Sequence, residues 1–299
     1  HVLFIANYVI ESERLMTDGS TDEIRQMVGE AYMLRAYMHF LLVNLHAPAY
    51  TACDPASTKA IPLKLDSDVE GILSRNTVAE VYASIVKDLD SADDYLNVDS
   101  WQPGYNYRFT TLSVDALRSR VMLYMGRWDE ARKAADRVLV VKNALSAVGS
   151  ELPNAYNSAE NILALEQVMS AQYARALKVN RDFYRLFSSS DLRRRAYFNQ
   201  VTSSNILLVK GGSNTHTCSF RVAEMLLNAA EAACRDGLTD DAADYLLTLQ
   251  RTRYNDGGAA KEAAIADMTQ DQLLAEILDE RARELAFEGH RWFDLRRTT

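Results

Sequence analysis

Apolar side chains recur every three or four residues along most of the chain, which is the spacing of one face of an α-helix. Ser20 with Glu23, and Thr77 with Glu80, have the spacing of capping boxes, which mark helix starts. The pattern predicts helices over residues 22–45, 77–96, 111–125, 127–141, 219–236, 239–253 and 270–288, and a further packing helix over 1–16. More than half of the residues should be helical and strand content should be minor, so we expect an all-α fold.

Two pairs of the predicted helices form helical hairpins, over residues 111–141 and 220–254. In each hairpin a turn glycine, Gly126 or Gly237, is followed five residues later by alanine, and small residues let paired helices approach closely. The spacing resembles the tetratricopeptide repeat, although a period of about 34 residues is not sustained. We therefore expect a tetratricopeptide-like helical-repeat scaffold with irregular loop excursions.

The helical pattern is interrupted over residues 142–217 by turns and by a β-like run at 205–209. We therefore divide one domain, residues 1–299, into three parts. An N-terminal helical-repeat part covers 1–141, an irregular excursion covers 142–217, and a C-terminal helical-repeat part covers 218–299.

The predicted helix at 270–288 has an apolar stripe that charged residues interrupt. Arg281 and Glu288 lie on the same face as the leucines of this helix. A buried charge without a partner is strongly destabilising, so we expect both to be buried and bonded to an opposite charge or to backbone. Gly289 should end the helix, and a second short element should follow to complete a structural clasp. The clasp residues are Arg281, Glu284, Glu288, Arg291 and Asp294.

Glutamates recur at every fourth position of this helix, from Glu276 to Glu288. Such a row can serve acid–base catalysis or a di-metal site. Ion pairing with Arg281, Arg283 and Arg291 is the favoured interpretation, because like charges at this spacing repel one another unless they are neutralised. The chain has no metal-ligand spacing of the His-Glu-x-x-His or Cys-x-x-Cys kind, no phosphate-binding glycine loop and no Gly-x-Ser-x-Gly. We expect no metal, no cofactor and no catalytic set.

The net charge of -8 and the pI near 5.2 argue against a nucleic-acid partner, because binding to a phosphate backbone needs clustered Lys and Arg. The cysteines Cys53, Cys218 and Cys234 cannot all pair with one another and show no metal spacing.

No apolar run approaches the roughly 18 residues of a membrane span. The chain begins in what reads as the middle of a helix, so we expect a signal peptide and a lipid-bearing cysteine to precede it in the native protein.

Helical periodicity fails over residues 98–109, where aromatic and polar side chains alternate. A sugar site needs aromatic faces for the C–H surface of the sugar and fixed polar groups for its hydroxyls. The candidate ligand-binding residues are Trp101, Tyr105, Asn106, Tyr107 and Arg108, with Gln102 beside them. The same rings can instead anchor the loop to the body of the protein. In that case the long proline-containing loop at 47–76, around Tyr50 and Asp54, is the next candidate.

Four stretches of the chain carry a further signal. They are GEAYMLRAYMHFLLVNLH from Gly29, RNTVAEVYASIVKDLDSA from Arg75, FRVAEMLLNAAEAA from Phe220 and ERARELAFEGHRWFDLRR from Glu280. In sequence and in order, these stretches resemble the SusD/RagB family of outer-membrane glycan-binding lipoproteins. The resemblance implies a non-catalytic, lipid-anchored cell-surface protein that binds an oligosaccharide or similar nutrient. It also implies delivery of that ligand to a TonB-dependent, SusC-like outer-membrane transporter.

Two other interpretations stay open. A tetratricopeptide-type adaptor that binds peptides would explain the helical hairpins, but it has no need of the charged pattern at 288–297. A helical glycoside hydrolase would need paired carboxylates, which would come from the clasp or from Asp90, Asp93 and Asp94.

Overall fold

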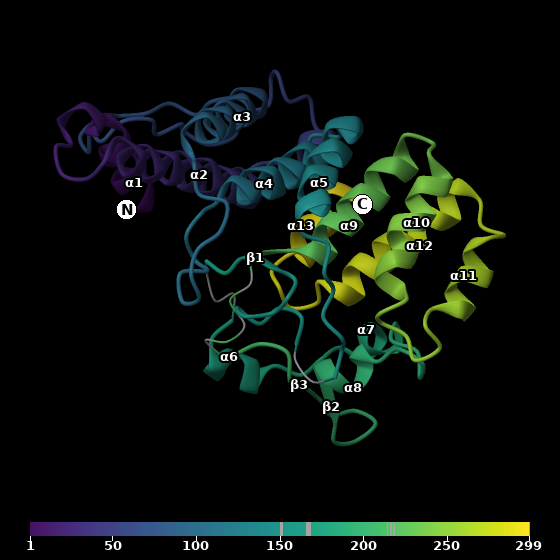
Figure 1. Cartoon of the computed structure of the whole chain (residues 1–299). Helices are drawn as coiled ribbons and strands as arrows, with labels where there is room; N and C mark the ends of the chain where they lie inside the picture. The colour runs from purple at the N-terminus through teal and green to yellow at the C-terminus, as the bar shows by residue number, and fades with distance from the viewer. Residues whose placement is uncertain (150–151, 166–168, 214, 216, 218, 299) are drawn as a thin grey trace. The chain divides into compact units, whose positions relative to one another are not determined.

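The computed structural model describes residues 1–149, 152–165, 169–213, 215, 217 and 219–298. More than half of these residues are helical and the strands are short, so the predicted all-α, tetratricopeptide-like class is confirmed (Figure 1). The chain divides into two compact units. The first comprises His1–Arg127 and Phe293–Thr299, and the second comprises Trp128–Trp292. The division into three parts made from the sequence stays a prediction.

The first unit is organised around its longest helix, α2. Its elements are α1 (Val2–Glu11), η1 (Glu13–Leu15), α2 (Thr21–His46), η2 (Tyr50–Ala52), α3 (Val78–Tyr95), α4 (Thr111–Tyr124) and the larger part of α13 (Arg291–Thr298). Helix α2 packs against α1, α3 and α4, as the purple and blue ribbons of Figure 1 show. The capping boxes at Ser20 and Thr77 are present, which confirms both predicted helix starts.

A buried polar cluster fixes three of these helices to one another. Arg35 of α2 donates to both carboxylate oxygens of Asp88 on α3, at 2.6 and 2.9 Å. The same guanidinium donates to the Asn7 side chain of α1 at 3.0 Å, and Asn7 in turn donates to the backbone oxygen of Asp66. This bidentate contact gives the packing a fixed register in addition to apolar burial.

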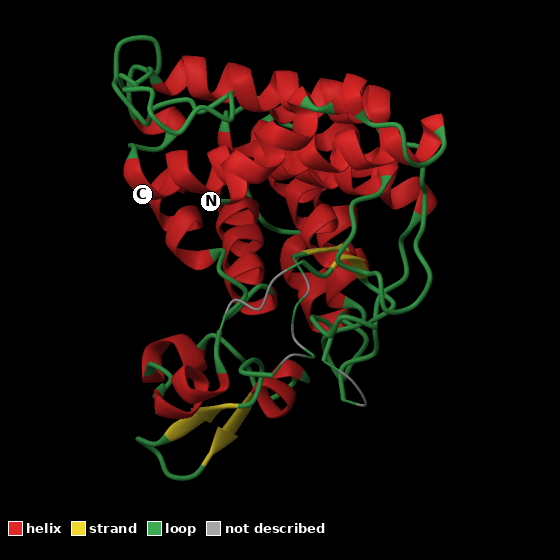
Figure 2. Ribbon diagram, turned by 90° about the vertical axis from the view of Figure 1, so that its left-hand side faces the viewer, coloured by secondary structure: helices red, strands yellow, loops and turns green. Residues whose placement is uncertain are grey.

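The second unit contains two groups of elements. The longer helices are α5 (Trp128–Val141), α9 (Val222–Arg235), α10 (Thr239–Gln250), α11 (Ala259–Ile265) and α12 (Gln270–Glu284). Between α5 and α9 lie β1 (Asn161–Leu163), α6 (Ala171–Ala176), α7 (Arg181–Arg185), α8 (Arg193–Tyr197), β2 (Phe198–Gln200), β3 (Ile206–Leu208) and β4 (Phe220–Arg221). Among the described residues, the strands form two antiparallel pairs, β1 with β4 and β2 with β3 (Figure 2). The predicted β-like run at 205–209 is therefore confirmed as β3.

Helix α9 is the centre of the second unit. It packs against α5, α10 and α12, and almost every one of its residues is buried. Alanines at 229, 230, 232 and 233 allow this, because small side chains let several helices approach one axis. Cys234 is buried in the same apolar cluster, as a small hydrophobe would be. The turn to α10 uses Gly237 at φ 79°, a left-handed conformation that glycine adopts without strain.

Four predicted helix boundaries are wrong, and in three cases polar contacts give the reason. Helix α12 ends at Glu284, four residues early, because its last carbonyl is bound by cations. Helix α10 ends at Gln250, which frees Arg253 to enter a buried network described below. Helix α9 begins at Val222, because Phe220–Arg221 pair with β1. Helix α1 ends at Glu11, followed by the single 3-10 turn η1.

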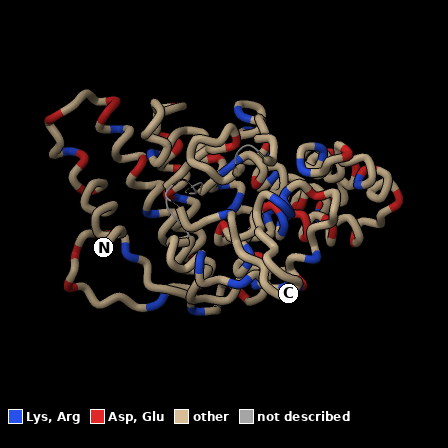
Figure 3. Tube along the Cα trace, turned by 90° about the horizontal axis from the view of Figure 1, so that it is seen from below, with Lys and Arg blue, Asp and Glu red and all other residues tan. Residues whose placement is uncertain are grey.

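Acidic and basic residues are interspersed along the described trace (Figure 3), and the net charge of the chain is -8. Within the described part of the chain, no helix is long and apolar enough to cross a membrane. Cys53 and Cys234 are free thiols, whereas Cys218 lies outside the described residues.

Candidate functional site

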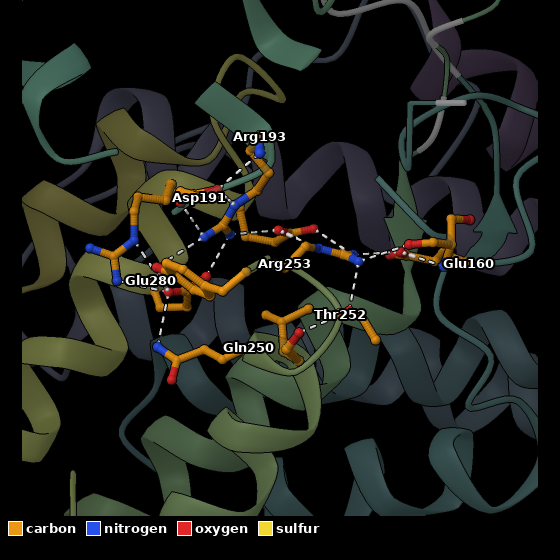
Figure 4. A network of polar contacts seen from close by, with 12 residues as sticks. Glu160, Asp191, Arg193, Gln250, Thr252, Arg253 and Glu280 are labelled. Atoms are coloured by element: carbon orange, nitrogen blue, oxygen red, sulfur yellow. Dashed lines mark hydrogen bonds and ion pairs between the residues drawn. The ribbon is translucent and has the colours of Figure 1, made fainter. Parts of the chain in front are cut away.

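The end of α12 lies in a buried network of charged side chains within the second unit (Figure 4). Its acidic members are Glu160, Asp191, Glu280, Glu284 and Glu288, and its basic members are Arg193, Lys210, Arg221, Arg253 and Arg283. The charges balance, as burial in a low-dielectric interior requires. The network joins the irregular segment between α5 and α9 to the helices that follow it.

Glu284 is the hub of this network. Its carboxylate accepts hydrogen bonds from Arg193 at 2.8 Å, from Arg221 at 2.6 Å and twice from Arg253 at 2.9 Å. Arg253 also donates to Glu160 at 2.5 Å, and Figure 4 shows its guanidinium pointing toward that residue. Three guanidinium groups on one carboxylate form a rigid unit, because each arginine fork has a fixed planar geometry.

The backbone at the end of α12 is bound by the same cations. The carbonyl oxygen of Glu284 accepts hydrogen bonds from Lys210 Nζ and Arg221 Nη2, both at 2.8 Å. Positive charge at a helix C-terminus satisfies free carbonyls and opposes the helix dipole. Phe287, at φ 63°, and Gly289, at φ 86°, then turn the chain so that Glu288 faces Lys210 and Arg221.

The pKa values of these acids follow from their partners. Burial alone would raise the pKa of Glu284, but Arg253, Arg221 and Arg193 outweigh it and hold the pKa well below its usual value. The pKa of Glu288 is lowered in the same way, because Arg221 and Lys210 outweigh desolvation. Burial is the dominant effect on Lys210 and lowers its pKa to about 8, although Glu288 opposes that shift.

The structure places most of the sequence-derived clasp residues inside the protein. Arg281 and Glu288 are buried, as the interruption of the apolar stripe predicted, and Arg281 donates to the Asn228 side chain at 2.6 Å. Asp294 is buried in α13 and pairs with Arg297 at 2.9 Å. Arg291 is exposed and forms no ion pair with any described residue.

The predicted neutralisation of the glutamates is therefore partly wrong. Arg283 does pair with Glu276 and Glu280. The partners of Glu284 and Glu288 instead come from distant segments, through Arg193, Arg221, Arg253 and Lys210. One of these partners, Arg193, lies in the run Asp191-Leu192-Arg193, where the two charges are buried and paired at 2.8 Å.

The arrangement of this network suits a structural role. A general acid needs a raised pKa and access to a substrate, whereas the pKa values of Glu280, Glu284 and Glu288 are lowered and the three carboxylates are buried. Within the described ranges, no group of three or more His, Cys, Asp or Glu residues is arranged to hold a metal ion.

The aromatic loop at 98–109 lies in the first unit and is held at both ends by one buried side chain. Gln26 of α2 accepts hydrogen bonds from the backbone N–H groups of Asn97 and Val98, at 3.0 and 3.1 Å. It donates through Nε2 to the carbonyl oxygen of Phe109 at 3.1 Å. Contacts with α2, in addition to contacts within the loop, therefore hold the loop in its conformation.

Trp101 and Arg108 anchor the middle of this loop. The indole N–H of Trp101 donates to the Phe109 carbonyl at 3.0 Å, and the Arg108 guanidinium stacks on the indole at 3.9 Å. Arg108 also pairs with Glu30 of α2 at 2.5 Å. Asn106 accepts from the Gly104 N–H within the loop turn. Trp101 therefore anchors the loop to the body of the protein, which is the alternative role that the sequence left open for these rings.

The remaining two rings are turned toward solvent. Tyr105 and Tyr107 are 49% and 50% exposed, with centroids 6.2 Å apart, and Tyr105 lies 6.5 Å from Trp101. Two neighbouring half-exposed rings on a fixed loop leave part of their apolar surface uncovered by packing. We call Trp101, Tyr105 and Tyr107 the aromatic platform.

The alternative candidates at 47–76 have local roles. Tyr50 packs edge-on against the buried Tyr82, with ring centroids 5.0 Å apart. Asp54 accepts from the Ser57 hydroxyl and the Ala56 N–H, which closes a turn. Among the described residues, neither Tyr50 nor Asp54 contacts a ring of the aromatic platform.

Fold and site together define an all-α helical-repeat protein with a charged core. Two family models match the chain: one described as the SusD family, over residues 190–299, and one described as "Starch-binding associating with outer membrane", over 2–123. Together these matches cover more than half of the chain. The chain belongs to the SusD/RagB family.

Two curated relatives come from Formosa agariphila. SusD-like protein P38 is 25% identical over 91% of this chain and 66% of its own length, and SusD-like protein P2 is 23% identical over 99% and 69%. The chain thus spans about two thirds of the length of these relatives. Among solved structures, a SusD superfamily protein from Bacteroides thetaiotaomicron has a TM-score of 0.82 at 24% identity, covering 98% of this chain and 72% of that one. A SusD-like carbohydrate binding protein from Bacteroides vulgatus has a TM-score of 0.78 at 21% identity, covering 99% and 67%. These structural likenesses show the fold.

Proposed function

We propose that this protein binds an oligosaccharide or similar nutrient at the aromatic platform and releases it unchanged. The observation that carries the proposal is the pair of half-exposed rings, Tyr105 and Tyr107, on a loop that Gln26 holds at both ends. A fixed platform loses little conformational entropy when it binds a ligand. The description of a SusD-like relative as carbohydrate binding supports the same class of ligand.

The roles within the loop follow from the geometry of its side chains. Tyr105 and Tyr107 offer ring faces to the C–H surface of a sugar, while Trp101 and Arg108 hold the loop in place. The backbone and polar side chains between the rings, Asn106 included, supply partners for sugar hydroxyls. Each exposed ring should contribute about 1 kcal/mol, in line with other aromatic contacts. We therefore expect weak, reversible binding.

We also propose that the protein does not hydrolyse the bound saccharide, because of the burial, ion pairing and pKa values of its carboxylates. Glu280, Glu284 and Glu288 are buried and ion-paired, and their pKa values are lowered. Asp90 pairs with Arg118 at 2.7 Å, and Asp93 lies 3.9 Å from the same guanidinium. Glycoside hydrolysis needs one carboxyl with a raised pKa to protonate the leaving oxygen, whereas the pKa values of Glu280, Glu284 and Glu288 are lowered.

We further propose that the protein acts at the outer membrane, held there by a lipid anchor. The family model that matches residues 2–123 is described as associating with the outer membrane, which supports this location. In this setting the bound saccharide would pass to a TonB-dependent, SusC-like transporter. Co-purification with such a transporter after crosslinking in cells would test the partnership.

The binding site is tested by Tyr105→Ala with Tyr107→Ala, measured by calorimetry against glycans identified in an array screen. The double variant should bind about 30-fold more weakly, which corresponds to about 2 kcal/mol. Tyr173→Ala is a matched control, because this tyrosine is 60% exposed but lies in α6 of the second unit. Equal affinity of the double variant and the control would move the site away from the platform.

A further inference from the structure

A hollow lies in the first unit where the chain segment at 60–75 passes the C-terminal end of α2. Its volume is about 550 Å³, a size typical of small-molecule sites. It is lined by Leu42, His46, Ala60, Ile61, Pro62, Lys64, Leu73 and Arg75. The walls are thus aliphatic, and the polar side chains among them are all basic.

The guanidinium of Arg75 is held in one orientation by backbone carbonyl groups and keeps one edge available for a ligand. Its guanidinium donates through Nε to the Ala60 carbonyl and through Nη2 to the Lys59 carbonyl, both at 2.7 Å, so the planar group is held in one orientation. Its Nη1 group has no hydrogen bond to any described residue, and no carboxylate of the described chain pairs with it. An oriented guanidinium with a free edge is suited to an oxyanion.

Two further side chains with nitrogen donors, His46 and Lys64, line the same hollow. The His46 side chain lines the hollow and forms no hydrogen bond with the described residues. Lys64 pairs with Asp66, whose side chain is 57% exposed and lies outside the lining. A pair that is open to solvent contributes little, so Lys64 can exchange this partner for a bound anion at low cost.

The C-terminal end of α2, next to the hollow, does not repel an anion as an uncovered helix C-terminus would. The carbonyl groups at a helix C-terminus carry partial negative charge. At the end of α2, however, the Arg296 guanidinium binds the carbonyl oxygens of Asn44 and Ala47, the latter at 2.6 Å. This cation offsets the negative end of the helix next to His46.

We propose that this hollow, which we call the basic pocket, binds the anionic group of an acidic saccharide. Arg75 and Lys64 contact the oxyanion, and the aliphatic walls contact the C–H surface of the sugar ring. The anion is either the carboxylate of a uronic acid or a sulfate ester, since both present paired oxygens to a guanidinium. The inference builds on the proposed saccharide binding and names acidic saccharides as its ligand class.

The test compares three disaccharides by calorimetry at low salt: digalacturonic acid, neutral galactobiose and a monosulfated galactobiose. The wild-type protein should bind at least one acidic ligand about tenfold more tightly than galactobiose, as expected for one charge-assisted hydrogen bond. The acidic ligand that binds more tightly identifies the anion. Arg75→Gln and Lys64→Gln should each remove this preference and leave the affinity for galactobiose unchanged.

Lys59→Gln is the matched control, because Lys59 is an exposed neighbour whose side chain does not line the pocket. It should retain the acidic preference. Should Arg75→Gln disturb folding through its backbone contacts, Lys64→Gln carries the test, with circular dichroism as the check. Equal wild-type affinity for acidic and neutral ligands overturns the proposal, as does a preference that survives both substitutions. The Tyr105→Ala, Tyr107→Ala variant separates the two proposals, because it should weaken the binding of galactobiose at the aromatic platform and leave the binding of the acidic disaccharide at the basic pocket unchanged.

Discussion

Replacing Glu284 with Gln removes the central negative charge of the buried network while keeping the side-chain shape. The substitution leaves Arg193, Arg221 and Arg253 sharing fewer counter-charges in an environment without solvent. The amide group of Gln also turns a donor toward guanidinium groups that are themselves donors. Both effects destabilise the folded state and have no counterpart in the unfolded chain.

The size of the effect follows from the hydrogen bonds that the carboxylate makes. Glu284 accepts four charge-assisted hydrogen bonds from the three arginines, at 2.6 to 2.9 Å. Breaking a buried ion pair from one side costs about 3–5 kcal/mol, because the remaining charge stays buried without a partner. We therefore expect Glu284→Gln to lower the free energy of unfolding by about 3–5 kcal/mol.

Hydrogen exchange under native conditions, read segment by segment by mass spectrometry, is the suitable assay. It reports the second unit separately from the first, which a single unfolding curve does not. Glu262→Gln is the matched control, since its side chain is 56% exposed and pairs with an exposed Arg251. The control should change the opening free energy by less than about 1 kcal/mol.

The two variants should differ most in the amides of α9, α10 and α12, which pack together around the network. Protection factors of Glu284→Gln that match those of Glu262→Gln would refute the structural role assigned to Glu284. Failure of Glu284→Gln to fold, with Glu262→Gln folded, would meet the prediction in its strongest form.

Three further predictions concern single side chains. Glu288→Ala should lower the free energy of unfolding by about 3–5 kcal/mol, and a decrease under about 0.5 kcal/mol by the same assay would contradict its buried pairing. Burial lowers the pKa of Lys210 to about 8 from 10.5, so the unfolded state binds more protons between these values. Stability should therefore rise with pH from about 8 to 9.5 by up to about 1.4 kcal/mol per unit relative to Lys210→Met; parallel pH profiles would count against it. Gln26→Ala should speed amide exchange over residues 97–109 and weaken glycan binding, whereas unchanged exchange would show that the loop is held by other contacts.

Local signals made the helices predictable. Capping boxes and apolar spacing act within a few residues, and the starts at Thr21, Val78 and Gln270 follow them closely. The early end of α12 was not predictable in this way, because it depends on Lys210 and Arg221. These residues lie more than sixty positions earlier in the chain.

The site was predictable only in part for a related reason. The clustering of Trp101, Tyr105 and Tyr107 is visible in the sequence, but the division between an anchoring ring and two exposed rings depends on contacts with α2. The basic pocket left no motif, because Arg75 and His46 meet through the path of the intervening loop.

Saturation-transfer NMR with a bound glycan, followed by chromatography of the recovered ligand, tests the central claim most directly. Saturating the protein should transfer magnetisation to the C–H protons of the sugar in the wild type, and the transfer should weaken sharply in the Tyr105→Ala, Tyr107→Ala variant. The glycan should be recovered with its length unchanged after prolonged incubation. Shortened chains would contradict binding without turnover, and full transfer in the double variant would contradict binding at the aromatic platform.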